Sequence, residues 1–137
     1  MAVKLRNNKL ELDAYKKQLM TAQLNKCPLC GGSLLALTPV NRVLDHDHDT
    51  GFCRAVVCRG CNGAEGKILS VISGYGKAGN SKYFQIKFLR NLLAYWETHQ
   101  TPQTDRIYHN YKSPAELREA KNRKARQAYL KKGGKSG

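Results

Sequence analysis

The sequence predicts an α+β fold, mainly helical, in which a short β-hairpin and the helix after it are held together by four cysteines. Three observations support this prediction. Apolar residues recur at helical spacing in three segments, and two apolar stretches flank a turn signal at residues 49–51. The motif C-x2-C also occurs twice, as Cys27 with Cys30 and as Cys58 with Cys61. The 137 residues suffice for one compact domain, or for a small core with extended arms.

The composition favours a polyanionic partner. Lys and Arg outnumber Asp and Glu by 24 to 10, a formal net charge of +14, and a surplus of this size points to DNA or RNA more than to solubility alone. Hydrophobic residues make up 41% of the chain, which is low for its size. A bound metal or a partner chain would therefore help to stabilise so small a core.

The first 20 residues contain no apolar run long enough for a signal peptide or a membrane span. We therefore expect a cytoplasmic protein with no membrane partner. Thiols stay reduced in the cytosol, so the five cysteines are interpreted as metal ligands before disulfides.

Residues 1–26 are expected to form an N-terminal helix, because apolar side chains recur through residues 3–24 with Lys and Arg between them. Residues 27–76 are expected to form the metal-bound core. Within it, the apolar stretches at 33–45 and 52–57 predict a hairpin around the Asp-Thr-Gly turn. A helix should follow the hairpin, since three apolar residues lie at helical spacing after Cys58: Ile68, Leu69 and Ile72.

Residues 77–101 are expected to form a packing or dimerisation helix that begins near Asn80 or Ser81 and ends near His99. Its apolar face would be formed by five large side chains: Phe84, Phe88, Leu92, Tyr95 and Trp96. Such a face either packs on the core or makes a dimer contact.

Residues 102–137 are expected to form a basic linker and helix. Ser113 and Glu116 match a capping box, with Pro114 at the first helical position. Residues 112–137 hold nine Lys or Arg against two Glu, which suits either a solvated face or an arm lying along phosphates.

The two cysteine pairs, separated by 27 residues, are typical of two zinc knuckles that share one tetrahedral ion. Cys27, Cys30, Cys58 and Cys61 are therefore predicted to bind a structural Zn²⁺. Four sulfurs close the coordination shell, so this ion would do no chemistry. Cys53, the remaining cysteine, is expected to be a small, partly buried apolar residue.

Two histidines and three aspartates alternate through residues 45–49. In an extended strand the aspartates would share one side and the histidines the other, so strict alternation separates Asp45 from His46. A strand that ends or bulges near Asp45 would bring the two together. The alternative is a polar, solvated turn, which is the interpretation we keep for Asp47 and Asp49.

Asn62 and Glu65 change the balance between these interpretations. They follow the last cysteine of the second pair and lie three residues apart, which places them on one face of a helix. Oxygen ligands such as those of Asp45, Asn62 and Glu65 suit a hard cation like Mg²⁺, whereas thiolates suit zinc. The candidate ligands therefore form two groups: the cysteine thiolates suit zinc, and the oxygen ligands suit a hard cation.

The stretches LDHDHDTG at 44–51 and FCRAVVCRGCNGAEG at 52–66 resemble the recombination endonuclease VII family, within the HNH or His-Me finger nucleases of phage type. The resemblance is close over residues 27–66, and LLAYW near residue 95 is similar in character only. It implies a zinc-stapled ββα-metal (His-Me) finger core with flanking helices. It also implies a phage-encoded protein that acts in the cytoplasm of a bacterial host.

The resemblance further implies a role for each site residue. Asp45 and Asn62 would bind one catalytic Mg²⁺ or Mn²⁺, and His46 would be the general base that activates water. His48 and Glu65 would support the site by contacting phosphate or orienting ligands. Basic residues of the core and tail are expected to contact DNA: Arg54, Arg59, Lys67, Lys121, Arg123, Lys124 and Arg126.

The function expected from these residues is a Mg²⁺-dependent DNA endonuclease with a one-metal mechanism. Two substrates remain open: branched DNA, which would require a homodimer with paired sites, or linear DNA cut by a free-standing homing-type or nicking enzyme. The alternative of another class is a non-catalytic zinc-ribbon module that binds DNA or acts as an adaptor. That module would explain the cysteines and the charge, but it gives no reason for Asp45, His46, Asn62 and Glu65 to occur together.

Overall fold

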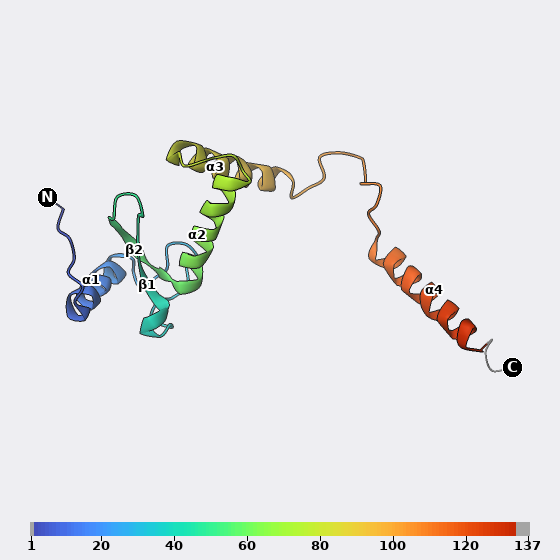
Figure 1. Cartoon of the computed structure of the whole chain (residues 1–137), viewed down its shortest axis with the longest axis horizontal. Coiled ribbons are helices and arrows are strands. Elements are labelled where there is room, and N and C mark those ends of the chain that lie inside the picture. Colours follow the sequence, from blue (N-terminus) through green and yellow to red (C-terminus); the bar gives the residue numbers. More distant parts are fainter. Residues whose placement is uncertain (1, 134–137) are drawn as a thin grey trace. The chain divides into compact units, whose positions relative to one another are not determined.

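The computed structural model describes residues 2–133, and about half of the chain is helical (Figure 1). The chain divides into two compact units after Leu93, inside the third helix. The elements, in order, are α1 (Lys9–Ala22), a short 3-10 helix (Pro39–Asn41), β1 (Arg42–His46), β2 (Cys53–Cys58), α2 (Arg59–Gly74), α3 (Lys82–Thr98) and α4 (Pro114–Gly133). The α+β class expected from the sequence is confirmed.

Helix α1 is shorter than the predicted residues 3–24, because Asn8 caps its N-terminus and the helix begins only at Lys9. The Asn8 Oδ1 accepts hydrogen bonds from the backbone N–H groups of Leu10 and Glu11, at 2.9 and 3.3 Å, which is an N-cap. Beyond the helix, Leu24 and Asn25 have φ values of 54° and 57°, so the chain turns sharply toward the first cysteine pair.

Strands β1 and β2 form the antiparallel hairpin expected around residues 49–51. The prediction of strand over residues 33–41 was wrong. Pro39 opens the 3-10 helix there, and the Arg42 side chain instead holds the preceding loop through the carbonyl oxygens of Leu34 and Leu37, at 2.8 and 2.7 Å. A loop fixed by a guanidinium in this way needs no strand partner.

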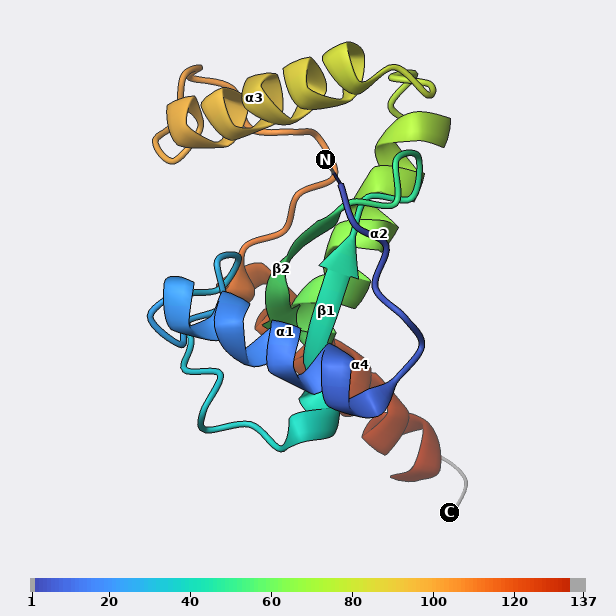
Figure 2. The same cartoon turned by 90° about the vertical axis from the view of Figure 1, so that its left-hand side faces the viewer.

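The hairpin lies between α1 and α2, as Figures 1 and 2 show. Its inner side chains join α1 and the first cysteine pair in one small core: Met20, Cys27, Leu34, Val56 and Val57. The Gln23 side chain acts as a substitute strand on the free edge of β2. Its amide nitrogen donates to the Val56 carbonyl and its oxygen accepts from the Val56 N–H, both at 2.8 Å.

The turn between the strands is built around Asp47, which the sequence alone assigned to a solvated turn. The Asp47 Oδ1 accepts from the N–H groups of Asp49 and Thr50, at 2.8 and 3.0 Å, and Gly51 follows with φ 79°. These two backbone hydrogen bonds, assisted by the nearby Lys82 charge, hold the pKa of Asp47 below its ordinary value of 3.8. Asp47 is thus a structural turn residue.

Asp47→Ala should lower the melting temperature by roughly 4 °C, because both turn N–H groups lose their acceptor. Asp47→Asn keeps an acceptor oxygen and should lower it less. A thermal melt followed by circular dichroism measures both, with Asp49→Ala as the control, since the Asp49 side chain is 75% exposed. Equal melting temperatures for the Ala and Asn variants would contradict this role.

The same contact predicts an acid dependence. Folding lowers the pKa of Asp47, so its ionised form stabilises the fold above the ordinary value of 3.8, and this contribution is lost as the pH falls through the lower folded value. The wild-type melting temperature should therefore fall more steeply below about pH 4 than that of Asp47→Asn.

Helix α3 begins and ends within two residues of the predicted bounds. It is joined to α2 by the buried Gln85, whose side-chain amide donates to the Ser73 hydroxyl and the Gly79 carbonyl at 3.2 and 2.8 Å. Two of the five predicted face residues, Phe88 and Leu92, are partly buried. The other three are more than half exposed: Phe84, Tyr95 and Trp96.

Helix α4 begins with the predicted capping box. The Ser113 Oγ accepts from the Glu116 N–H at 3.2 Å, and the Glu116 carboxylate accepts from the Ser113 N–H at 3.3 Å. No residue of α4 is buried.

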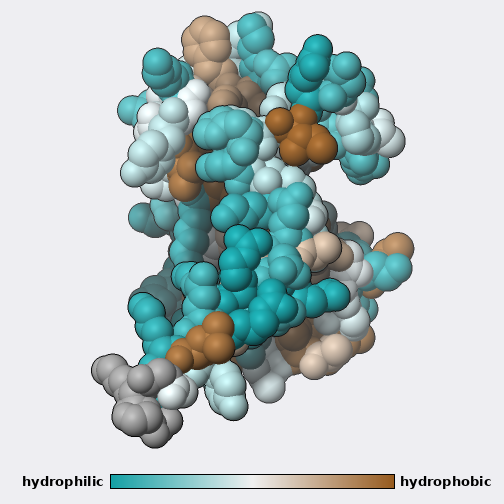
Figure 3. Space-filling view, turned by 90° about the vertical axis from the view of Figure 1, so that its right-hand side faces the viewer, coloured by the Kyte–Doolittle hydropathy of each residue, from teal (hydrophilic) through white to brown (hydrophobic). Residues whose placement is uncertain are grey.

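Hydrophilic side chains dominate the face drawn in Figure 3, with only scattered hydrophobic ones between them. Within residues 2–133, no helix combines the length and apolarity that crossing a membrane requires.

Candidate metal centres and nucleic-acid cleft

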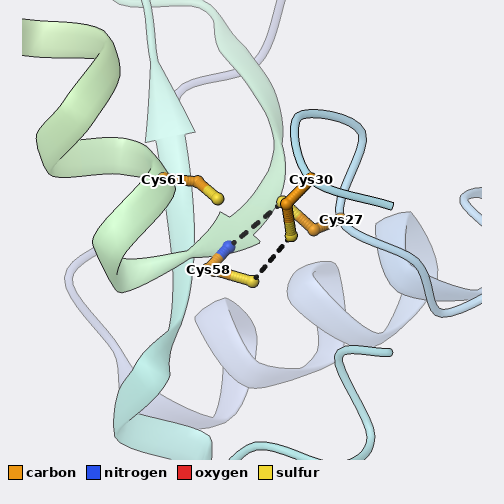
Figure 4. A group of neighbouring side chains, drawn as sticks. All are labelled: Cys27, Cys30, Cys58 and Cys61. Atoms are coloured by element: carbon orange, nitrogen blue, oxygen red, sulfur yellow. Dashed lines mark hydrogen bonds between the residues drawn. The ribbon is translucent and has the colours of Figure 1, made fainter. Parts of the chain in front are cut away.

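The four predicted cysteines lie together at one corner of the core (Figure 4). Cys27 and Cys30 come from the loop after α1, Cys58 is the last residue of β2, and Cys61 lies in the first turn of α2. All four Sγ atoms lie within 4.8 Å of one another, and those of Cys30 and Cys58 are 3.6 Å apart. Zinc–sulfur bonds of about 2.3 Å in a tetrahedron place the sulfurs roughly 3.8 Å apart, so the group fits such an ion.

The thiols perturb one another. Burial opposes ionisation of Cys27, but backbone N–H donors, chiefly those of Cys30 and Cys58, outweigh it and lower its pKa to about 6. Burial, together with the neighbouring Cys30 and Cys27, raises the pKa of Cys58 to about 12. A hydrogen bond with Cys30, followed by burial, raises the pKa of Cys61. The lowered pKa favours the Cys27 thiolate, whereas the raised pKa values of Cys58 and Cys61 oppose their ionisation, and a bound cation would displace those protons.

Cys53 stands apart from this group. It is half-buried at the start of β2 and is absent from the cysteine cluster, as predicted. Its separation leaves a four-sulfur ligand set.

Asp45 and His46 lie at a β-bulge, one of the two arrangements that the sequence required. Asp45 pairs with Ala55 and His46 pairs with Cys53, so Arg54 is the extra residue on β2. The Asp45 side chain is only 14% exposed, whereas His46 is exposed at the end of β1. The rings of His46 and His48 lie on one side, with centroids 4.7 Å apart.

A cleft of about 430 Å³ runs between the hairpin turn and α2. It brings together the predicted residues His48, Asn62 and Glu65, so the helical spacing placed Asn62 and Glu65 on one face as expected. Asp45 and His46 do not line this cleft. Its charged lining includes Asp49, Arg54 and Lys67.

The cleft also contains Lys82, which sequence reasoning missed. The Lys82 Nζ lies 3.8 Å from an Asp47 carboxylate oxygen and 3.6 Å from one of Asp49, so the start of α3 is held to the hairpin turn. No local pattern indicates this contact, because it depends on how α2 and its following turn direct α3.

Arg54 joins the bulge to α2. Its Nε donates to the Asp45 Oδ2 at 2.7 Å, and its Nη2 lies 3.2 Å from the Glu65 Oε1. The hydrogen bond to Asp45 is the main reason that the pKa of Arg54 is raised. Asp45 is thereby connected to Glu65 of the cleft through one guanidinium.

The other basic residues predicted to contact DNA are exposed. Arg59 is the first residue of α2, and four more lie on α4: Lys121, Arg123, Lys124 and Arg126. Among these, Arg126 pairs with Glu119 at 3.2 Å. Lys67, at the cleft, has no carboxylate within 4.0 Å among the residues that the structure describes.

The donor chemistry near the bulge also suits a hard cation. Asp45 offers a carboxylate and Asn62 an amide oxygen, the ligand types that Mg²⁺ and Mn²⁺ prefer. The Arg54 hydrogen bond engages only one Asp45 oxygen, Oδ2. The other Asp45 oxygen, Oδ1, lies outside this hydrogen bond, and Asn62 lines the cleft that Asp45 does not line.

One known protein family matches the part of the chain that contains these sites. The model of recombination endonuclease VII matches residues 3–98, more than half of the chain. The matched segment contains both cysteine pairs, the bulge, the cleft and all of α1 to α3, and it leaves α4 outside. Because the match spans the whole described core rather than one motif, the chain belongs to the recombination endonuclease VII family.

Proposed function

We propose that this protein is a Mg²⁺-dependent DNA endonuclease that hydrolyses phosphodiester bonds by a one-metal His-Me finger mechanism. The observation that carries the proposal is the bulge at Asp45 and His46 directly beside a cleft that contains Asn62 and Glu65. Family membership supports a nuclease, and the net charge of +14 supports DNA as the partner.

The proposal assigns zinc to the four cysteines, because a closed set of four thiolates is typical of structural zinc sites. The catalytic ion, Mg²⁺ or Mn²⁺, would be held by Asp45 and Asn62. When bound, such an ion supplies positive charge that stabilises the phosphate transition state and the departing 3′ oxygen. Zinc would therefore stabilise the fold, and Mg²⁺ or Mn²⁺ would take part in catalysis.

The protein's own groups would do the remaining work. The imidazole of His46 would take a proton from the attacking water, the role that histidine most often has in general-base catalysis. His48, whose ring lies against that of His46, would contact the phosphate or orient its neighbour. Glu65 would orient the ligands from α2.

The four parts of the chain would then have distinct tasks. Within residues 1–26, helix α1 packs on one side of the hairpin, and residues 27–76 would form the nuclease core. Residues 77–101 would supply a dimer contact, because Phe84, Tyr95 and Trp96 of α3 are more than half exposed. Residues 102–137 would form the basic arm.

Cleavage of supercoiled plasmid tests the proposal directly. We expect nicked product with Mg²⁺ and none with EDTA. Wild-type protein that binds DNA but never cuts it with Mg²⁺ or Mn²⁺ would instead support the non-catalytic zinc-ribbon module. A four-way junction compared with a linear duplex, together with native mass spectrometry, distinguishes a dimeric junction-resolving enzyme from a free-standing nicking one.

The basic arm predicts a change in salt dependence. Replacing Lys121, Arg123, Lys124 and Arg126 with Gln should weaken DNA binding and lower the slope of log K against log salt by about 0.9 for each phosphate that is no longer neutralised. Fluorescence anisotropy in EDTA measures the slope. The matched control also replaces four basic residues with Gln, at the other end of the chain: Lys4, Lys9, Lys16 and Lys17. An unchanged slope in the α4 variant would mean that α4 does not lie on phosphates.

A further inference from the structure

The Arg54 side chain contacts two carboxylates, whereas an arginine that binds phosphate needs its guanidinium directed at the DNA. It is the extra residue of the bulge, so its side chain leaves the normal alternation of β2. The guanidinium contacts Asp45 on β1 and Glu65 on α2, so it joins the strand to the helix. Both carboxylates belong to the proposed catalytic site.

The local charge argues against phosphate binding by Arg54. Without a bound ion, one guanidinium between two carboxylates forms a group with net negative charge, which repels a DNA phosphate rather than attracting it. The planar fork of arginine suits this bridging role, because its nitrogens can donate in two directions at once. Lys67, which has no such carboxylate partner within residues 2–133, is the better phosphate ligand at the cleft.

We infer that Arg54 is a positioning residue: it holds Asp45 of the strand and Glu65 of the helix at a fixed separation, and it does not bind DNA. This inference rests on the proposed function for the importance of the two carboxylates. It replaces the sequence-based assignment of Arg54 to DNA contact. The Arg54–Asp45 contact, at 2.7 Å, is shorter than the Arg54–Glu65 contact, at 3.2 Å. Because it engages Oδ2 of Asp45, the Oδ1 atom is the one that can bind an ion.

The first test separates positioning from phosphate binding. Arg54→Met and Arg54→Lys should both lower the single-turnover cleavage rate with Mg²⁺ by about 100-fold, since small misplacements of catalytic groups cost that much. In EDTA, both should keep the wild-type affinity for a DNA duplex and its salt slope. Lysine keeps the charge but lacks the fork, so it should not restore the rate.

The opposite results would overturn the inference. A phosphate ligand at residue 54 predicts a salt slope lower by about 0.9 in Arg54→Met, with rate and affinity restored in Arg54→Lys. Arg6→Met is the matched control, because it removes a guanidinium that pairs with Glu11 at 3.0 Å, away from the cleft. Circular dichroism and metal content establish that each variant is folded.

A second measurement is independent of catalysis. Melting temperatures of Arg54→Met, Glu65→Ala and the double variant should be non-additive, because either single change already removes the Arg54–Glu65 contact. Additive shifts would mean that the bridge is not formed in solution and would overturn the inference. If the wild type does not cut DNA, the proposed function fails, while the salt slope and the double-variant comparison still decide the role of Arg54.

Discussion

His46→Ala is expected to lower the single-turnover cleavage rate by about 10²- to 10⁴-fold, the range typical for loss of a general base. The imidazole lies at the end of β1, exposed to an incoming DNA strand and beside His48. Alanine removes the proton acceptor without removing any buried contact, so folding should be unaffected. Rapid-quench cleavage of a labelled duplex or junction with saturating Mg²⁺ measures the rate.

Three controls accompany this variant. Its zinc content and its DNA affinity in EDTA should equal those of the wild type, which would assign the loss to chemistry. His109→Ala, in the linker before α4, should cut at the normal rate. A His46→Ala protein that cuts nearly as fast as the wild type would remove the proposed general base.

Cys58→Ser is expected to abolish stable folding of the core, the largest structural effect we predict. Cys58 is the last residue of β2 and the residue that precedes α2, and its N–H donates to the Cys27 sulfur at 3.5 Å. Since the free energy of zinc binding is part of the free energy of folding, losing one of four ligands removes much of the stability of so small a core. Thermal melts and metal analysis should show a non-cooperative transition and zinc well below one ion per chain.

The matched control is Cys53→Ser, which makes the same substitution five residues earlier in the same strand. Cys53 lies outside the four-sulfur group, so this variant should bind zinc and melt cooperatively. A chelator should unfold both the wild type and Cys53→Ser. A Cys58→Ser protein that folds without metal would show that metal binding by the four cysteines is not what stabilises the core.

The parts of the fold that could be predicted from the sequence are those with local causes. The two C-x2-C pairs, the turn at residues 49–51 and the capping box of Ser113 and Glu116 each depend on a few neighbouring residues, and each is confirmed. The start of α1 also had a local signal, Asn8, but amphipathic spacing alone extended the helix past it.

The features that escaped prediction depend on register and on distant contacts. Alternation indicated that Asp45 and His46 needed a strand end or a bulge to come together. It could not identify Arg54 as the extra residue of a bulge, because that depends on how β2 pairs with β1. The contacts of Lys82 with the hairpin turn depend on the path of the chain after α2. The exposure of Phe84 and Trp96 could not be predicted either, since an apolar stripe indicates a covered face without identifying what covers it.

The direct passage from β2 into α2 has a consequence for engineering. Cys58 ends the strand and Arg59 begins the helix, so no connecting residue exists that could absorb an insertion or act as a pivot. An insertion there would rotate Asn62 and Glu65 about the helix axis, by about 100° per added residue. Attempts to redirect this protein to new DNA should therefore graft or lengthen segments beyond Thr98, and leave the stretch from Cys58 to Glu65 at its present length.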